Sequence, residues 1–336
     1  MRTYLRNRND RNRTTSSGAK AQDLLGPTVG AEAPTPGART DEMGSSDDKH
    51  VITRRDFVRG TAGATLGAVA MGGTLEALAT PVATSQVVLV REQWVLDEKQ
   101  EVNTGILKIM LRNALTKVTG KPDPTSAWRS LVKTDDVIGL VATDHLNKTH
   151  SELIDLVRES LTEAGVPKSN IRNAQGGPEK AKACTALIAL PALKAHWLTG
   201  IGTVLKNYIT FSGSPSSYHD ANNANLGEIW NMPHVKGKTK LVLVDALRPL
   251  CDKGPQPDPR YLWDYKGLIA GTDPVAVESV CLKIILQKRQ ALRGEPWPLS
   301  PPPMCVEMAD KKYGLGTSRM EQIQVDRIGW TDDALV

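Results

Sequence analysis

The sequence predicts an α/β protein in which a mostly parallel sheet carries helices on both faces, and three observations predict it. Short apolar runs rich in valine, isoleucine and leucine recur from residue 86 onward. Segments with apolar residues three and four apart separate several of these runs, as expected of helices that bury one face. The clearest run, KLVLVDA at residues 240–246, is continuously apolar in its centre, as a strand covered on both sides is. Strands that alternate with helices build parallel sheets.

The predicted elements follow in order. A strand at residues 86–91 (QVVLVR) precedes a helix over residues 103–118, and a strand at residues 137–142 precedes a helix over residues 150–165. Further strands are expected near Ile171 and over residues 186–190, 240–246, 268–270 and 323–325, with a short helix near residues 306–312. A long helix over residues 273–292 begins at Asp273-Pro274, an N-cap followed by proline at the first helical position. Two polar or proline-rich stretches, residues 213–225 and 247–265, are expected as loops.

The first 79 residues differ in composition from the rest. Residues 1–50 are so poor in apolar side chains that we predict a disordered extension. Residues 51–79 resemble a twin-arginine export signal: Arg54 and Arg55 precede Phe57, a weakly apolar segment follows, and Ala77-Leu78-Ala79 matches a small-residue cleavage site. The pattern predicts recognition by the twin-arginine translocation machinery and a periplasmic or extracellular single α/β domain over residues 80–336. The alternative is an uncleaved membrane anchor, for which the glycines and threonines of the segment are unfavourable.

Charge, cysteine spacing and missing motifs exclude several classes of function. The net charge is only +5 over 336 residues, and nucleic-acid binding needs a basic face, so nucleic acid is not the expected partner. The four cysteines form no C-x-x-C pair, so no iron–sulfur cluster is expected; they are Cys184, Cys251, Cys281 and Cys305. They are expected either as small buried residues or, after export, as disulfides. The nucleotide motifs G-x-G-x-x-G after the first strand and G-x-x-x-x-G-K-[ST] are absent, as is the hydrolase motif G-x-S-x-G. The identity of any cofactor stays open.

Polar residues follow four of the predicted strands, where ligands bind in open α/β sheets. They are Asp144, His145, Asn147, Lys148 and His150 after residues 137–142; Lys194, His196, Lys206 and Asn207 after residues 186–190; Asp245 in residues 240–246; and Thr272 and Asp273 after residues 268–270. Taken singly, most have an ordinary explanation. A lysine or histidine on a turn is usually solvated, and Asp273 caps a helix.

The strongest candidate is residues 191–207 (PALKAHWLTGIGTVLKN), which we expect as a strand, a turn with Gly200 and Gly202, and a helix. Two lysines, a histidine and a helix N-terminus favour negative charge, so we expect an anionic or phosphate-bearing ligand here. His196 and Lys194 are the candidate catalytic residues, with His196 as general acid or base. The candidate ligand-binding residues are Lys206, Asn207, Asp245 and Asp273.

A metal-dependent hydrolase or oxidoreductase is an alternative. Asp220, Asp245, His196 and His219 have the side chains that metal ions prefer, although no fixed spacing such as H-E-x-x-H supports a metal site.

Three ordered blocks resemble a known family. They are residues 191–196 (PALKAH) with Thr199-Gly200 and Leu205-Lys206-Asn207, residues 244–246 (VDA) with Gly254-Pro255, and residues 271–277 (GTDPVAV). In this order, over roughly residues 86–295, they resemble the domain-of-unknown-function 362 family. The resemblance implies the α/β fold and agrees with twin-arginine export, which many members use. It implies no established reaction.

The chain departs from that family's pattern after the second predicted strand. The family usually shows G-I-K-x-N, whereas residues 139–143 read GLVAT, so the lysine and the asparagine are absent. If that lysine serves the family's site, the function here is altered or lost. A non-catalytic binding or accessory protein is therefore the second hypothesis.

Overall fold

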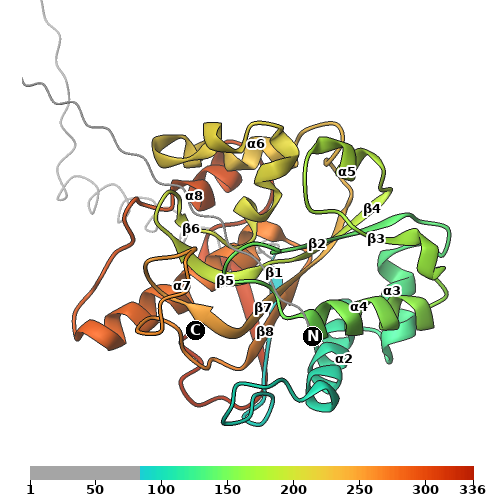
Figure 1. Cartoon of the computed structure of the whole chain (residues 1–336), viewed down its shortest axis with the longest axis horizontal. Helices are drawn as coiled ribbons and strands as arrows, with labels where there is room; N and C mark the ends of the chain where they lie inside the picture. Colours follow the sequence, from blue (N-terminus) through green and yellow to red (C-terminus); the bar gives the residue numbers. More distant parts are fainter. Residues whose placement is uncertain (1–83) are drawn as a thin grey trace, which may run out of the picture. The chain divides into compact units, whose positions relative to one another are not determined.

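The computed structural model describes residues 84–336, which build a nine-stranded sheet (Figure 1). The predictions for residues 1–50 and 51–79 lie outside the described residues. The strands are β1 Ser85–Arg91, β2 Ile138–Ala142, β3 Ile171–Asn173, β4 Ala186–Leu190, β5 Ala192–His196, β6 Gly200–Ile201, β7 Thr239–Leu250, β8 Gly267–Gly271 and β9 Ile323–Gly329. The α-helices are α2 Thr104–Thr119, α3 Pro124–Leu131, α4 Ser151–Glu163, α5 Pro178–Lys182, α6 Leu226–Trp230, α7 Pro274–Arg293 and α8 Met304–Lys311. Short 3₁₀ helices are η1 Lys168–Asn170, η2 Leu205–Ser212, η3 Pro215–Tyr218, η4 Asp220–Asn225 and η5 Met320–Gln322.

The sheet is mixed and mostly parallel, which confirms the predicted α/β class. Its strand order is β3-β2-β4-β7-β8-β1-β9, and β5 pairs with β7 and β6. Strands β3, β2, β4 and β7 are parallel to one another, and so are β1 and β9. Strand β8 is antiparallel to both β7 and β1. The link from β7 to β8 contains no helix, and an antiparallel pair needs no crossover helix to join it.

Successive side chains of the strands enter two separate cores. Val88 and Val90 of β1 pack with apolar residues of α2, α3 and α4, which lie beside one another in Figure 1. Val87 and Leu89 pack with apolar residues of α6, α7 and α8. Because both sides of these strands are buried, their sequences lack the alternation of apolar and polar residues typical of a half-exposed strand.

Strand β5 continues along β7 where β4 stops. Ala189 of β4 lies opposite Val242, and Ala192 of β5 lies opposite Asp245 further along the same strand. Pro191 separates the two strands; it has no N–H to donate, but its carbonyl oxygen accepts the amide of Asp245 at 2.8 Å. This continuation carries Lys194 and His196 past the carboxyl end of β4.

The four cysteines are free and buried, as small apolar residues are. In the described part of the chain, no helix combines the length and apolar character needed to cross a membrane.

Candidate functional site

The candidate site lies at the carboxyl ends of β2 and β4, where β5 turns back into a hairpin. β5 and β6 pair in antiparallel fashion, with His196 opposite Gly200. Residues 191–207 are thus a strand, a hairpin and the start of a 3₁₀ helix, rather than the strand, turn and α-helix expected from the sequence. The hairpin places the residues before η2 next to Lys194: the amide of Gly202 donates to the carbonyl oxygen of Lys194 at 2.9 Å, and the amide of Lys194 donates to Thr203 Oγ1 at 3.1 Å.

A cavity of about 190 Å³ opens between the hairpin, η2 and the β2–α4 loop. Its lining consists of Thr143, Asp144, His145, Gln175, Lys194, His196, Gly202, Lys206, Asn207, Ile209, Thr210 and Pro255. Four of the six predicted site residues therefore converge here: Lys194, His196, Lys206 and Asn207. Asp245 and Asp273 do not line the cavity.

The loop that bears Pro255 approaches β5 closely at Gly254. The carbonyl oxygen of Gly254 accepts the amide of Trp197 at 2.8 Å. A Cβ atom on Gly254 would lie 1.9 Å from the carbonyl oxygen of Ala195, a distance that no side chain can occupy. Glycine at this position thus lets the loop close one wall of the cavity.

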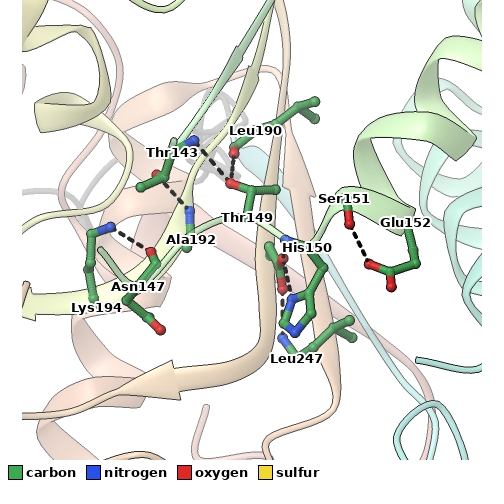
Figure 2. Close-up of polar contacts among 11 residues, drawn as sticks. Thr143, Asn147, Thr149, His150, Ser151, Glu152, Leu190, Ala192, Lys194 and Leu247 are labelled. Carbon is green, nitrogen blue, oxygen red and sulfur yellow. Dashed lines mark hydrogen bonds and ion pairs between the residues drawn. The ribbon is translucent and has the colours of Figure 1, made fainter. Parts of the chain in front are cut away.

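Lys194 is the more buried of the two lysines in the cavity, with only 5% of its surface exposed. Its Nζ atom donates to the carbonyl oxygen of Asn147 at 2.9 Å, a contact visible in Figure 2. Burial, and then the charge of Lys206, lower the pKa of Lys194 to about 7, although Asp245 and Asp144 oppose the shift. Near neutral pH this amine can therefore both accept and release a proton.

Lys206 extends from η2 into the same cavity and is partly buried. Burial lowers its pKa to about 8, and burial is the sole cause. No carboxylate within residues 84–336 forms an ion pair with its ammonium group. An ammonium group that is partly buried and makes no ion pair is suited to bind an anion from solution.

His196 is held with one ring nitrogen turned to the protein backbone. Its Nδ1 atom accepts the amide of Leu198 at 3.1 Å, so the neutral ring carries its proton on Nε2. Burial, and then the charges of Lys206, His219 and Lys194, lower the pKa of His196 to about 2. The ring is neutral at physiological pH and offers Nε2–H as a donor. This geometry favours hydrogen-bond donation over the general acid–base role expected from the sequence.

Asn207 joins η2 to the end of β2. Its Nδ2 atom donates to the carbonyl oxygen of Val141 at 2.6 Å, and its Oδ1 atom accepts from Thr143 Oγ1 and Gln175 Nε2, each at 3.3 Å. Thr143 also accepts the amide of Ala192 at 3.1 Å (Figure 2). Neither Thr143 nor Gln175 was predicted as a site residue, although both line the cavity.

The two positions that depart from the family's G-I-K-x-N pattern have different roles here. Val141, at the position of the family's lysine, is fully buried in the core shared with α6, α7 and α8. Thr143, at the position of the family's asparagine, supplies a hydroxyl group to the cavity wall. The wall is therefore still polar, and the cavity's positive charge comes from Lys194 and Lys206.

Asp245 does not line the cavity and instead forms hydrogen bonds with a loop that does. Its Oδ2 atom accepts from the backbone amide and from Nδ1 of His150, both at 2.7 Å, and its Oδ1 atom accepts the amide of Leu247 at 3.1 Å. Burial opposes the protonation of His150, but the hydrogen bond to Asp245 and its charge outweigh burial, so the pKa of His150 is raised. Thr149, next to His150, donates to the carbonyl oxygen of Leu190 at 2.6 Å (Figure 2). Asp245 thus holds the β2–α4 loop in place.

Asp273 was expected in the site, but it lies at the opposite edge of the sheet, away from Lys194 and Lys206. Because β8 is antiparallel to β7, Gly271 at its end pairs with Val242 near the start of β7. Asp273 caps α7 there, accepting the amides of Val275 and Ala276 at 2.9 Å each. Its second oxygen accepts from Ser85 Oγ at 2.6 Å and from the amide of Thr317 at 3.0 Å.

The amides at the start of η2 are also occupied, contrary to the expected use of a helix N-terminus for anion binding. Glu278 of α7 is fully buried, and its Oε2 atom accepts the amides of Val204 and, at 3.4 Å, Leu205. Glu278 was not among the predicted site residues. It fixes the start of the segment that bears Lys206 and Asn207.

The residues considered for a metal site do not assemble into one. The rings of His196 and His219 stack with centroids 5.9 Å apart, while Asp245 bonds His150 and Leu247. Within residues 84–336, no group of three or more histidine, cysteine, aspartate or glutamate side chains is arranged to hold a metal ion.

Fold and cavity together define an α/β protein with a basic pocket at the carboxyl ends of parallel strands. Residues 139–283 match the model of a family described as "Domain of unknown function (DUF362)", which confirms the resemblance over that segment. The match runs from β2 into α7 and contains every residue that lines the cavity. No curated protein and no solved structure was found to match the chain.

Proposed function

We propose that this protein binds a small anion, a phosphate or phosphate-bearing compound, in the cavity between the β5–β6 hairpin and η2. The observation that carries the proposal is the presence of Lys194 and Lys206 in one cavity of about 190 Å³, where neither ammonium group forms an ion pair with a carboxylate of the described residues. Burying two like charges is costly, and a bound anion offsets that cost.

Neutral donors around the two lysines support the same ligand. The hydroxyl group of Thr210 lines the cavity and is buried without a hydrogen-bond partner in the described residues. His196 offers Nε2–H because its Nδ1 is engaged. A tetrahedral anion has enough acceptor oxygens to satisfy these groups and both ammonium groups.

Lys194 is the side chain best suited to any chemistry on the bound ligand. Its pKa of about 7 lets it exchange a proton near neutral pH, whereas His196 stays neutral. A reaction at this site would therefore use Lys194 as acid or base and His196 as a hydrogen-bond donor. A binding protein without catalysis would use the same contacts.

Anion affinity should fall as the pH rises through the pKa values of the two lysines, about 7 for Lys194 and about 8 for Lys206. A bound anion favours the charged amines, so binding raises both pKa values and takes up protons. Sulfate is the best probe because its own charge is constant over this range. We expect its affinity to drop about 10-fold or more between pH 6.5 and 9, measured by titration calorimetry.

Calorimetry in two buffers of different ionisation enthalpy should show proton uptake upon sulfate binding near pH 8. Lys206→Gln should shrink this uptake, whereas Lys236→Gln on the exposed surface should leave it unchanged. If neither phosphate nor sulfate binds at pH 6.5, or if sulfate affinity does not depend on pH, the proposed function is wrong.

We also propose that the chain is exported by the twin-arginine pathway. The support is the sequence of residues 51–79 alone, with Arg54, Arg55 and Phe57 before a small-residue cleavage site at Ala77 and Ala79. Arg54→Lys combined with Arg55→Lys should retain the full-length precursor in the cytoplasm, as measured by cell fractionation and immunoblotting. The matched change Arg59→Lys should leave export intact. Equal export of both variants would contradict the proposal.

A further inference from the structure

A second cavity, of about 380 Å³, adjoins the proposed anion site. Its lining consists of Leu140, Ala142, Thr143, Asp144, Lys148, Thr149, Ser151, Ile154, Asn173, Gln175 and Lys180. Three residues, Thr143, Asp144 and Gln175, line both cavities. The two cavities therefore adjoin along these three residues, which form a shared wall at the carboxyl ends of β2 and β3.

The shared wall is held by hydrogen bonds that leave its outline fixed. Gln175 Nε2 donates to the carbonyl oxygen of Ala142 and, at 3.3 Å, to Asn207 Oδ1. Thr143 Oγ1 donates to the same Asn207 oxygen at 3.3 Å. A ligand that passes along this wall meets side chains that are already positioned, which lowers the entropic cost of binding.

Two lysines line each of the two cavities. Lys194 and Lys206 line the first, and Lys148 and Lys180 line the second. Lys148 and Lys180 are exposed, and no ion pair joins either of them to a carboxylate in the part of the chain that the structure describes. Asp144 is the single carboxylate among the residues that line either cavity, and it is exposed on the shared wall.

The size of the first cavity also points beyond a single small anion. Pockets for small organic ligands typically measure about 300–1,000 Å³. The cavity of about 190 Å³ holds one anionic group with few further atoms, whereas the adjoining cavity of about 380 Å³ provides room for the rest of a ligand.

We propose that the ligand carries two anionic groups, as a polyphosphate or bisphosphate does, and spans both cavities. One group lies between Lys194 and Lys206, and the second is bound by Lys148 and Lys180. This inference rests on the proposed anion site, and it adds a substrate class: a compound with two phosphate groups separated by at least one linking group.

The test compares inorganic phosphate with linear tripolyphosphate by titration calorimetry. The wild-type protein should bind tripolyphosphate about 10-fold or more tightly than phosphate. The double variant Lys148→Gln/Lys180→Gln should lose that advantage, so that the two affinities lie within about twofold of each other, while its phosphate affinity stays unchanged.

The variant Lys182→Gln/Lys236→Gln is the control for a general attraction of tripolyphosphate to positive charge. This variant also removes two positive charges, and one of its lysines, Lys182, belongs to the same helix α5 as Lys180. Lys182 does not line the cavity and instead forms an ion pair with Glu179 at 2.6 Å. It should keep the advantage of tripolyphosphate. If the Lys148/Lys180 variant keeps it as well, or if phosphate binds without any advantage for tripolyphosphate, the second subsite is wrong and the first site stands. If the wild-type protein binds neither probe, both proposals fail.

Discussion

Replacing both cavity lysines, Lys194→Gln with Lys206→Gln, should reduce phosphate affinity at pH 6.5 by about 100-fold or more. A hydrogen bond to a charged group contributes about 1.5–3 kcal/mol, and two such contacts are lost. Lys206→Gln alone should account for about 10-fold or more, because its ammonium group makes no ion pair with residues 84–336 and interacts mainly with the ligand. Titration calorimetry measures both effects.

Stability measurements separate this loss of contact from misfolding. The pKa of Lys194 falls from 10.5 to about 7 in the folded state, so between those values the unfolded chain binds more protons and stability rises with pH. Below pH 7 the full cost of burying the charged amine applies. The double variant should therefore unfold at higher denaturant concentration than wild type at pH 6.5, and its gain should shrink as the pH approaches 10. Retained phosphate affinity in this stable variant would show that the two lysines are not the anion site.

The position of the site followed from the direction of the strands. Lys194, His196, Lys206 and Asn207 come together because β2, β4 and β7 are parallel and place their carboxyl ends at one edge. The same reasoning failed for Asp273, since it assumed that β8 is parallel too. A usable signal was present: residues 251–266 contain three prolines and no helical pattern, and two strands joined without a helix are typically antiparallel.

The roles of single polar residues were harder to predict, because they depend on neighbours far away in the sequence. Asp245 lies at the expected edge of the sheet, but its carboxylate forms hydrogen bonds with His150, which is distant in the chain. Thr143 and Gln175 reach the cavity only because β2 and β3 are adjacent in the sheet. Spacing along the chain indicates which edge a residue reaches and leaves open which way its side chain turns.

Glu278 shows this most clearly, since the sequence offered one weak signal for it. It is a charged residue within the apolar face of α7, flanked by Val277 and by Val280 and Cys281, and such a residue is rarely buried without a partner. Its partners are backbone amides of Val204 and Leu205. The sequence does not reveal this contact, and the same amides were expected to bind the anion.

Glu278→Ala should produce the largest loss of stability among the substitutions considered, roughly 3–5 kcal/mol. It leaves two buried amides without an acceptor and creates a cavity under η2. Because η2 bears Lys206 and Asn207, phosphate affinity should fall as well, although Glu278 does not line the anion cavity. Denaturant unfolding and calorimetry provide the two measurements. A variant with wild-type stability would contradict the role assigned to Glu278.

Glu278→Gln is the matched control, because it keeps an acceptor for the two amides and removes the titration. Burial raises the pKa of Glu278 from 4.5 to about 8, so its stabilising contribution is complete below pH 4.5 and is lost as the pH rises through 8. Glu278→Gln should therefore match wild type at pH 4 and exceed its stability by about 1–3 kcal/mol at pH 9. If the carboxyl group instead acted on the ligand, Glu278→Gln would lose phosphate affinity. Retained affinity in the glutamine variant, with loss in the alanine variant, identifies Glu278 as a positioning residue for Lys206.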